Sequence, residues 1–164
     1  MNNQNKCPCG WDKPAQQCCE LLIDGKADAP TPLHLMRSRY TAYALKRYDY
    51  IQETMKPPAS DKFNLENSSN WSQTLKWEGL SILNYDLKSP TFGIVSFKAY
   101  YDENGHKGII AEKSEFHKIE GKWYYTDGKA LNPRIKTSIA PDALCLCQSQ
   151  KQYKDCCGQK EHAR

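Results

Sequence analysis

The sequence predicts an α+β protein in which a long helix packs on a curved antiparallel sheet, with a small cysteine-rich knob at each end of the chain. Three observations predict it. A helical pattern runs for about 24 residues from Thr31, the apolar period changes to two from Leu75 onward, and all eight cysteines fall into two clusters of one spacing. With 164 residues, 39% of them hydrophobic, the chain can bury one moderate core. We therefore expect a middle domain over residues 28–140, flanked by cysteine-rich segments 1–27 and 141–164.

The helix prediction rests on a start, a stop and one apolar stripe. Thr31 suits the N-cap with Pro32 at the first helical position, and the run ends before Pro57. Spacings of three and four place one set of side chains toward a core: Leu33, Met36, Tyr40, Tyr43, Ala44, Ile51 and Met55. Four basic residues are expected largely off that stripe: Arg37, Arg39, Lys46 and Arg47. A polar linker should follow over residues 59–69, and then a short second helix near Trp71 and Leu75.

The sheet prediction rests on four segments rich in aromatic and β-branched residues, at about 76–87, 91–101, 108–119 and 122–127. Turn signals separate them at Ser89-Pro90, Asn104-Gly105 and Glu120-Gly121. This order predicts an antiparallel meander. Alternation places Val95, Phe97, Ala99 and Tyr101 on one face of the second strand, and Ile110, Glu112, Ser114 and Phe116 on one face of the third.

Glu112 is unusual on such a face, because a buried carboxylate must be paired or protonated. One interpretation is a pocket between helix and sheet, lined by Arg37, Arg39, Glu112 and Ser114, in which an arginine pairs with the carboxylate. The other interpretation is that the strand twists and Glu112 reaches solvent at the edge of the sheet.

The two cysteine clusters share the pattern C-x-C, eight residues and C-C. The first comprises Cys7, Cys9, Cys18 and Cys19, and the second comprises Cys145, Cys147, Cys156 and Cys157. Four thiols so close in sequence can surround one tetrahedral ion, and zinc is the natural candidate. Four thiolates close the coordination shell and leave no open position for substrate. We therefore expect two structural zinc ions, one per cluster.

A disulfide framework is the alternative for these cysteines, and thiols that only fill a core are a third. Disulfides need an oxidising compartment and normally a secretory signal. Residues 1–6 are polar, and no stretch approaches the roughly 18 apolar residues of a membrane span. We therefore expect a reduced, cytoplasmic protein without membrane insertion.

The net charge does not indicate a partner once the metal is counted. The formal value is +4 with neutral cysteines. One dication with four thiolates carries about −2, so two such centres bring the total near zero.

Several stretches of the middle region together resemble the YchJ family of uncharacterised bacterial proteins. They are residues 31–43 (TPLHLMRSRYTAY), 48–51 (YDYI), 97–101 (FKAYY), 112–116 (EKSEF) and 123–128 (WYYTDG). The resemblance implies that the middle domain has the nuclear-transport-factor-2-like fold, a cone of curved antiparallel sheet around a long helix, often hollow.

The cysteine clusters resemble SEC-C motifs, named from the zinc-binding tail of the SecA preprotein translocase. The second copy keeps Lys151, Tyr153 and Lys154 beside its four cysteines, although Gln148 and Gln150 replace two usual glycines. The first copy keeps the cysteines but lacks the basic and aromatic pattern. The resemblance implies zinc binding by both copies and partner binding by the second alone, since the SecA tail contacts a chaperone and the ribosome.

Three classes of function remain open. The first is a protein-interaction or adaptor module, in which an unidentified protein partner docks on Lys151, Tyr153 and Lys154; the knobs can equally be staples of the fold. The second is a small-ligand binder or enzyme that uses the cavity of the middle domain. The third is a nucleic-acid binder, which the near-zero charge disfavours. The four histidines form no evident acid–base pair, so we name no catalytic residue.

Overall fold

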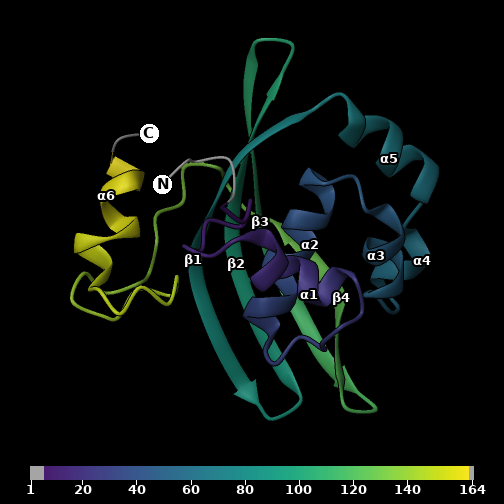
Figure 1. The fold of residues 1–164 in the computed structure, drawn as a ribbon, viewed down its shortest axis with the longest axis horizontal. Coiled ribbons are helices and arrows are strands. Elements are labelled where there is room, and N and C mark those ends of the chain that lie inside the picture. The colour runs from purple at the N-terminus through teal and green to yellow at the C-terminus, as the bar shows by residue number, and fades with distance from the viewer. Residues whose placement is uncertain (1–5, 163–164) are drawn as a thin grey trace.

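Four strands form a sheet that curves around a central helix (Figure 1). This computed structural model describes residues 6–162. The strands are β1 Lys76–Ser89, β2 Phe92–Glu103, β3 His106–Ile119 and β4 Lys122–Ala130, in the spatial order β1-β2-β3-β4. The helices are α1 Cys19–Ile23, α2 Pro32–Ala44, α3 Tyr48–Glu53, α4 Ala59–Lys62, α5 Leu65–Gln73 and α6 Cys157–His162, with 3-10 turns η2 Ala15–Gln17 and η3 Tyr153–Asp155.

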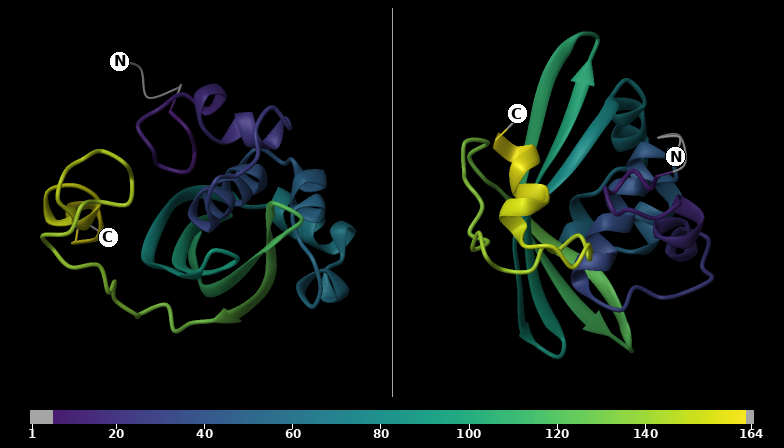
Figure 2. Two further views of the ribbon diagram at one scale, coloured as in Figure 1. Left: turned by 90° about the horizontal axis from the view of Figure 1, so that it is seen from below. Right: turned by 60° about the vertical axis from the view of Figure 1, so that its left-hand side comes forward.

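The helices α1 to α5 lie on one side of the sheet, and the segment after β4 runs around the other side to reach α6 (Figure 2). That segment is held at a bulge in β1. The register shifts between Ile82 and Asn84, and the carbonyl of Leu83 accepts hydrogen bonds from Thr137 Oγ1 at 2.9 Å and Ser138 N at 3.1 Å. None of the helices within residues 6–162 is long and apolar enough to cross a membrane.

The predicted meander is confirmed. All three pairings are antiparallel, and the turns fall at the three predicted signals. In β2 and β3, Phe97 pairs with Glu112, Val95 with Ser114 and Ala99 with Ile110. Because directly opposed residues share a face, the inner surface of the sheet carries these side chains as predicted.

The single helix of about 24 residues is wrong, because α2 ends at Ala44 and α3 starts at Tyr48. The break is a Schellman motif, in which the last carbonyls of a helix are satisfied by two reversed bonds. Arg47 N bonds the Ala42 carbonyl at 2.7 Å, and Lys46 N bonds that of Tyr43 at 3.2 Å. Lys46 is left-handed, with φ +60°. Such a position usually carries glycine, so the sequence shows no stop signal here.

The expected polar linker over residues 59–69 is also wrong in part. It contains α4 and the first half of α5, whose N-cap Asn64 accepts a 2.8 Å bond from Asn67 N through Oδ1. Trp71 lies in α5, so the short second helix is confirmed with an earlier start.

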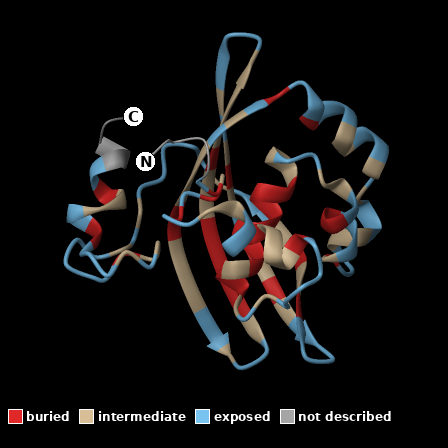
Figure 3. Cartoon of the chain, in the orientation of Figure 1, coloured by how far each residue is buried: buried red, intermediate tan, exposed pale blue. Residues whose placement is uncertain are grey.

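Helix α2 is buried on all sides rather than along one stripe (Figure 3). One side faces the sheet, and the other is covered by α1 and the N-terminal knob. Arg37 is 4% exposed and Arg39 is 8% exposed, against the expectation that they lie off the buried stripe. On the covered side, Ser38 Oγ bonds the Leu35 carbonyl and the Tyr50 hydroxyl, each at 2.8 Å, whereas Arg37 Nε is buried without a hydrogen-bond partner among the described residues.

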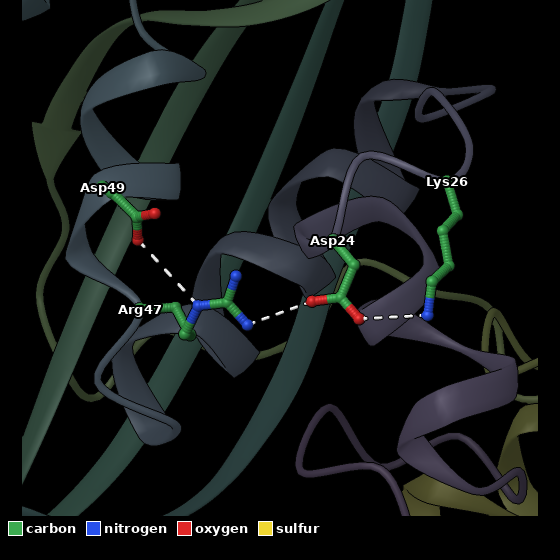
Figure 4. A network of polar contacts seen from close by, with 4 residues as sticks. All are labelled: Asp24, Lys26, Arg47 and Asp49. Atoms are coloured by element: carbon green, nitrogen blue, oxygen red, sulfur yellow. Dashed lines mark hydrogen bonds and ion pairs between the residues drawn. The ribbon is translucent and has the colours of Figure 1, made fainter.

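A surface network ties the break after α2 to the end of α1 (Figure 4). Arg47 donates to Asp24 Oδ1 at 3.0 Å, and Lys26 lies 3.3 Å from Asp24 Oδ2. The hydrogen bonds from Arg47 and Lys26 lower the pKa of Asp24 below its usual value. These groups are exposed, so the network orients the two segments and contributes little to stability.

Substitutions at Lys46 can distinguish a helix that breaks there from one continuous helix, because the two structures predict opposite orders of stability for glycine and alanine. At a left-handed residue glycine is better than alanine by about 1 kcal/mol, whereas inside a helix alanine is better by about the same amount. We therefore expect Lys46→Gly to have a larger free energy of unfolding than Lys46→Ala, measured by chemical denaturation. The reverse order would contradict the break.

Candidate functional site

Both cysteine clusters have the geometry of a tetrahedral metal site. The four Sγ atoms of each cluster lie within 4.8 Å of one another. In the first, Cys18 Sγ lies 3.7 Å from Cys9 Sγ and 3.9 Å from Cys19 Sγ. Four sulfurs at about 2.3 Å from one zinc would be about 3.8 Å apart, whereas a disulfide needs about 2.05 Å. All eight cysteines are free, so the residues fit a thiophilic ion rather than a disulfide framework.

The two knobs repeat one backbone structure at a constant offset of 138 residues. Cys7 N bonds the Lys13 carbonyl and Cys145 N bonds that of Lys151, both at 2.8 Å. Bridges join Lys6 to Pro14 and Leu144 to Gln152. A 3-10 turn then precedes the cysteine pair in each copy, and a helix starts at its second cysteine. The repeat therefore extends beyond the cysteines to the turns that position them.

The substitution of the usual glycines in the second copy has a visible backbone consequence. Gly10 has φ +90°, and its counterpart Gln148 has φ +63°, as does Gln150. Non-glycine residues at such angles are strained. The second knob therefore keeps the loop conformation of the motif without the residue that favours it.

The two clusters differ in burial. In the first, Cys7, Cys9 and Cys19 are at most 3% exposed and belong to the same hydrophobic cluster as α2. In the second, only Cys145 is buried, and Cys147 Sγ lies 3.3 Å from Cys156 Sγ. The first centre is therefore part of the core, and the second lies near the surface.

Protonation of the thiols opposes metal binding. Hydrogen bonds from Cys18 and Cys19, and more weakly the charge of Arg37, lower the pKa of the Cys9 thiol. The hydrogen bond with Cys18 contributes most to raising the pKa of Cys19. Since a metal binds thiolates, the Cys19 proton must leave, and acid should release the ion.

Arg37 serves the first cluster and not the cone for which it was predicted. Its Nη1 donates to the carbonyl of Cys9 at 2.5 Å, and its guanidinium lies 4.7 Å from the ring centroid of Trp11. A tetrathiolate centre is a dianion, so a buried cation beside it is favourable. No sequence pattern indicates this role, because 28 residues separate Arg37 from Cys9.

The knobs contact each other although they lie at opposite ends of the sequence. Trp11 Nε1 donates to the carbonyl of Leu146 at 3.3 Å, and Gln148 Nε2 of the second knob also lies 3.4 Å from Nε2 of His34 in α2. Both knobs lie near β1, and Figure 2 shows the first on the helix side and the second outside the edge of the sheet.

The predicted partner surface is only partly at the surface. Tyr153 is 6% exposed and fills the second knob, so it is wrong as a docking side chain. Lys154 forms an ion pair with Asp142, and Lys151 is exposed.

The cone contains a cavity of about 400 Å³ between α2 and the sheet. Arg39, Glu112 and Ser114 line it as predicted, and Arg37 does not. The walls are mainly aromatic, with side chains from helices and strands: Tyr40, Tyr43, Phe63, Trp71, Trp77, Phe97, Phe116 and Tyr125.

The predicted Arg–Glu ion pair is wrong, because Tyr125 stands between the two side chains. Arg39 Nη1 donates to the Ile51 carbonyl and to Thr54 Oγ1, each at 2.7 Å, and the guanidinium stacks 4.7 Å from the Tyr125 ring centroid. The Tyr125 hydroxyl then donates to Glu112 Oε1 at 2.9 Å. Burial, the neighbouring Glu112 charge and this bond raise the pKa of Tyr125. Sequence reasoning missed Tyr125; its alternation with Trp123 on the last strand was the available signal.

Glu112 is half-buried and does not reach solvent freely at a sheet edge. Its Oε1 also accepts a 2.7 Å bond from Ser114 Oγ. Arg39, Tyr125 and Glu112 therefore form a polar floor in an aromatic cavity.

The fold and the paired knobs define the class: a nuclear-transport-factor-2-like domain that carries SEC-C-type cysteine motifs. A family model described as the YchJ middle NTF2-like domain matches residues 31–128, and a SEC-C motif model matches residues 143–159. The chain belongs to the YchJ family, whose curated relatives carry the name UPF0225.

The similarity extends over whole chains. A UPF0225 protein of Geobacter sulfurreducens is 40% identical, covering 94% of this chain and 98% of its own. A SEC-C motif containing protein from Psychrobacter arcticus has a crystal structure with 30% identity and a TM-score of 0.66, covering 94% of this chain and 96% of its own. The solution structure of such a protein from Rhodopseudomonas palustris has 35% identity and a TM-score of 0.70, covering 77% and 99%.

The opposite orientations of Arg37 and Arg39 predict different effects on metal binding. Arg37→Gln removes the cation beside the first cluster, and loss of such an outer contact typically lowers metal affinity by about 10- to 100-fold. We expect a loss of this size at one of two sites when Zn²⁺ is titrated against a chromophoric chelator. Arg39→Gln, which changes the cone side of the same helix, should leave both affinities unchanged. Equal losses in the two variants would contradict the assignment.

Proposed function

We propose that this protein binds a small molecule in the cone, and that two zinc ions fix the ends of the chain against that domain. The observation that carries the proposal is the cavity of about 400 Å³ with the polar floor of Arg39, Tyr125 and Glu112. Ligand pockets in proteins are typically about 300–1,000 Å³, mainly apolar, with a few convergent polar groups.

The choice of zinc follows from the donor set. Four thiolates in a tetrahedral arrangement suit zinc, and they leave no position for a substrate or a reactive water. Zinc would therefore stabilise the fold here and take no part in a reaction. Eight free thiols also suit a reducing compartment, which supports a cytoplasmic location.

A protein-interaction role of the second knob is the second candidate. It is favoured by Leu144, which is 69% exposed where the knob begins, and by the exposed Lys151. A partner that docks on the second knob would meet both an exposed apolar side chain and a cation. Nucleic acid is less favoured, since the charge of a zinc tetrathiolate offsets the lysines.

The cone can be tested with its own tryptophans. Trp71 and Trp77 line the cavity, whereas Trp11 and Trp123 do not. We expect compounds from a library of small soluble aromatics to shift the indole N–H resonances of Trp71 and Trp77 in nuclear magnetic resonance spectra and to leave that of Trp123 in place. Ala59→Phe at the lining should weaken binding, and Ala140→Phe, at an exposed position after β4 and outside the lining, should not. Binding that moves no cone resonance would refute the proposal.

Zinc binding can be tested by matched serine variants in the two clusters. We expect about two zinc ions per wild-type chain by elemental analysis, and about one in either Cys18→Ser or Cys156→Ser. Because the first centre shares the core of α2, Cys18→Ser should lower the free energy of unfolding of the domain by about 2 kcal/mol or more, and Cys156→Ser by less.

Loss of both ions in either variant would show that the sites are coupled, and absence of zinc in the wild type would refute the metal assignment. The Cys156→Ser variant also tests the second candidate. A purified partner that binds it as tightly as the wild type would exclude the second knob as the docking surface.

A further inference from the structure

We propose that the cone selects a small organic cation, whose ammonium group meets Glu112 and whose apolar body lies among the aromatic walls. This inference rests on the proposed function of the cone and names its class of ligand.

Glu112 is a carboxylate held in place by uncharged groups. Ser114 Oγ and the Tyr125 hydroxyl both donate to Oε1, at 2.7 and 2.9 Å. Within the described residues, no hydrogen bond reaches Oε2, and no lysine, arginine or histidine nitrogen lies within the 4.0 Å of an ion pair. The Glu112 carboxylate is therefore oriented by two hydrogen bonds to one of its oxygens, and no cation of the described residues forms an ion pair with it.

Gly128 provides the room for this arrangement. A Cβ atom at that position would lie 2.3 Å from the Tyr125 hydroxyl and 2.4 Å from Glu112 Oε1. Both distances are too short for any side chain, so a residue other than glycine would displace the pair. The backbone of β4 thus leaves space for the carboxylate at the floor.

The walls suit a cation because aromatic rings surround the rest of the cavity. Trp77 contacts Tyr40, Tyr43 and Trp71 with ring centroids 5.7 to 6.2 Å apart, and all four line the cavity. A cation over such rings is attracted by the ring quadrupole, and the attraction grows when water is excluded. A half-buried carboxylate adds a full charge of the complementary sign.

Arg39 does not reverse this preference. Two hydrogen bonds of its Nη1 are made to Ile51 and Thr54, and its guanidinium covers the face of Tyr125. The guanidinium is held against the Tyr125 ring by these contacts, and it forms no ion pair with Glu112. An anionic ligand at the floor would be repelled by Glu112, while Arg39 stays bonded to Ile51 and Thr54. A cation instead completes the open side of the carboxylate.

Three probes that share one body and differ in charge test the inference. They are 2-phenylethylammonium, 3-phenylpropionate and 2-phenylethanol, titrated into the zinc-loaded full chain while the indole resonances of Trp71 and Trp77 are followed. We expect the ammonium probe to bind at least tenfold more tightly than the other two. Glu112→Gln keeps an acceptor and removes the charge, so it should lower that affinity at least tenfold.

Glu115→Gln is the matched control, since Glu115 lies on β3 but outside the residues that line the cavity. Preference for the carboxylate probe, or equal binding of all three, would overturn the cation while leaving a ligand site in the cone. Unchanged ammonium binding in Glu112→Gln would also overturn it. If none of the three probes moves a cone resonance, the cation inference fails. The proposed function is then tested separately by the library of small soluble aromatics.

Discussion

Burial of α2 from two sides is the constraint on which the rest of the structure depends. A helix of 13 residues packed only on the sheet would need one apolar stripe, but this helix also carries the first cysteine knob and α1 on its other side. Its polar residues must then find partners inside the protein. Arg37 finds the Cys9 carbonyl and Trp11, and Arg39 finds Ile51, Thr54 and Tyr125. Two arginines two positions apart thus define a cysteine-cluster side and a cavity side of one helix.

Much of the architecture could be predicted from local signals. The strands, their turns and their shared inner face follow from the period of two and from three turn dipeptides. The cysteine spacing predicted two clusters, and in the structure the four sulfurs of each cluster lie close together. These features depend on short stretches of chain, where backbone preference and the hydrophobic pattern agree.

The features that could not be predicted have no local sequence signal. Lys46 occupies a left-handed position without glycine, so the end of α2 has no sequence signature. Tyr153 is aromatic and flanked by lysines, which favoured a surface role, yet it is buried inside its knob. An arginine was expected to pair with Glu112, but the Tyr125 hydroxyl on the neighbouring strand donates to the carboxylate instead. For Glu112, a partner 13 residues away on the neighbouring strand decided the outcome.

The contact between Trp11 and Leu146 links positions 135 residues apart by one hydrogen bond of 3.3 Å. Such a bond is weak for separate molecules, but the intervening domain fixes both ends near each other. The second knob therefore acts on the first as a tethered ligand, at an effective concentration that short linkers can raise to about millimolar. Any molecule that competes for this contact with Trp11 must exceed that local concentration, so the chain itself limits access to its first cysteine cluster.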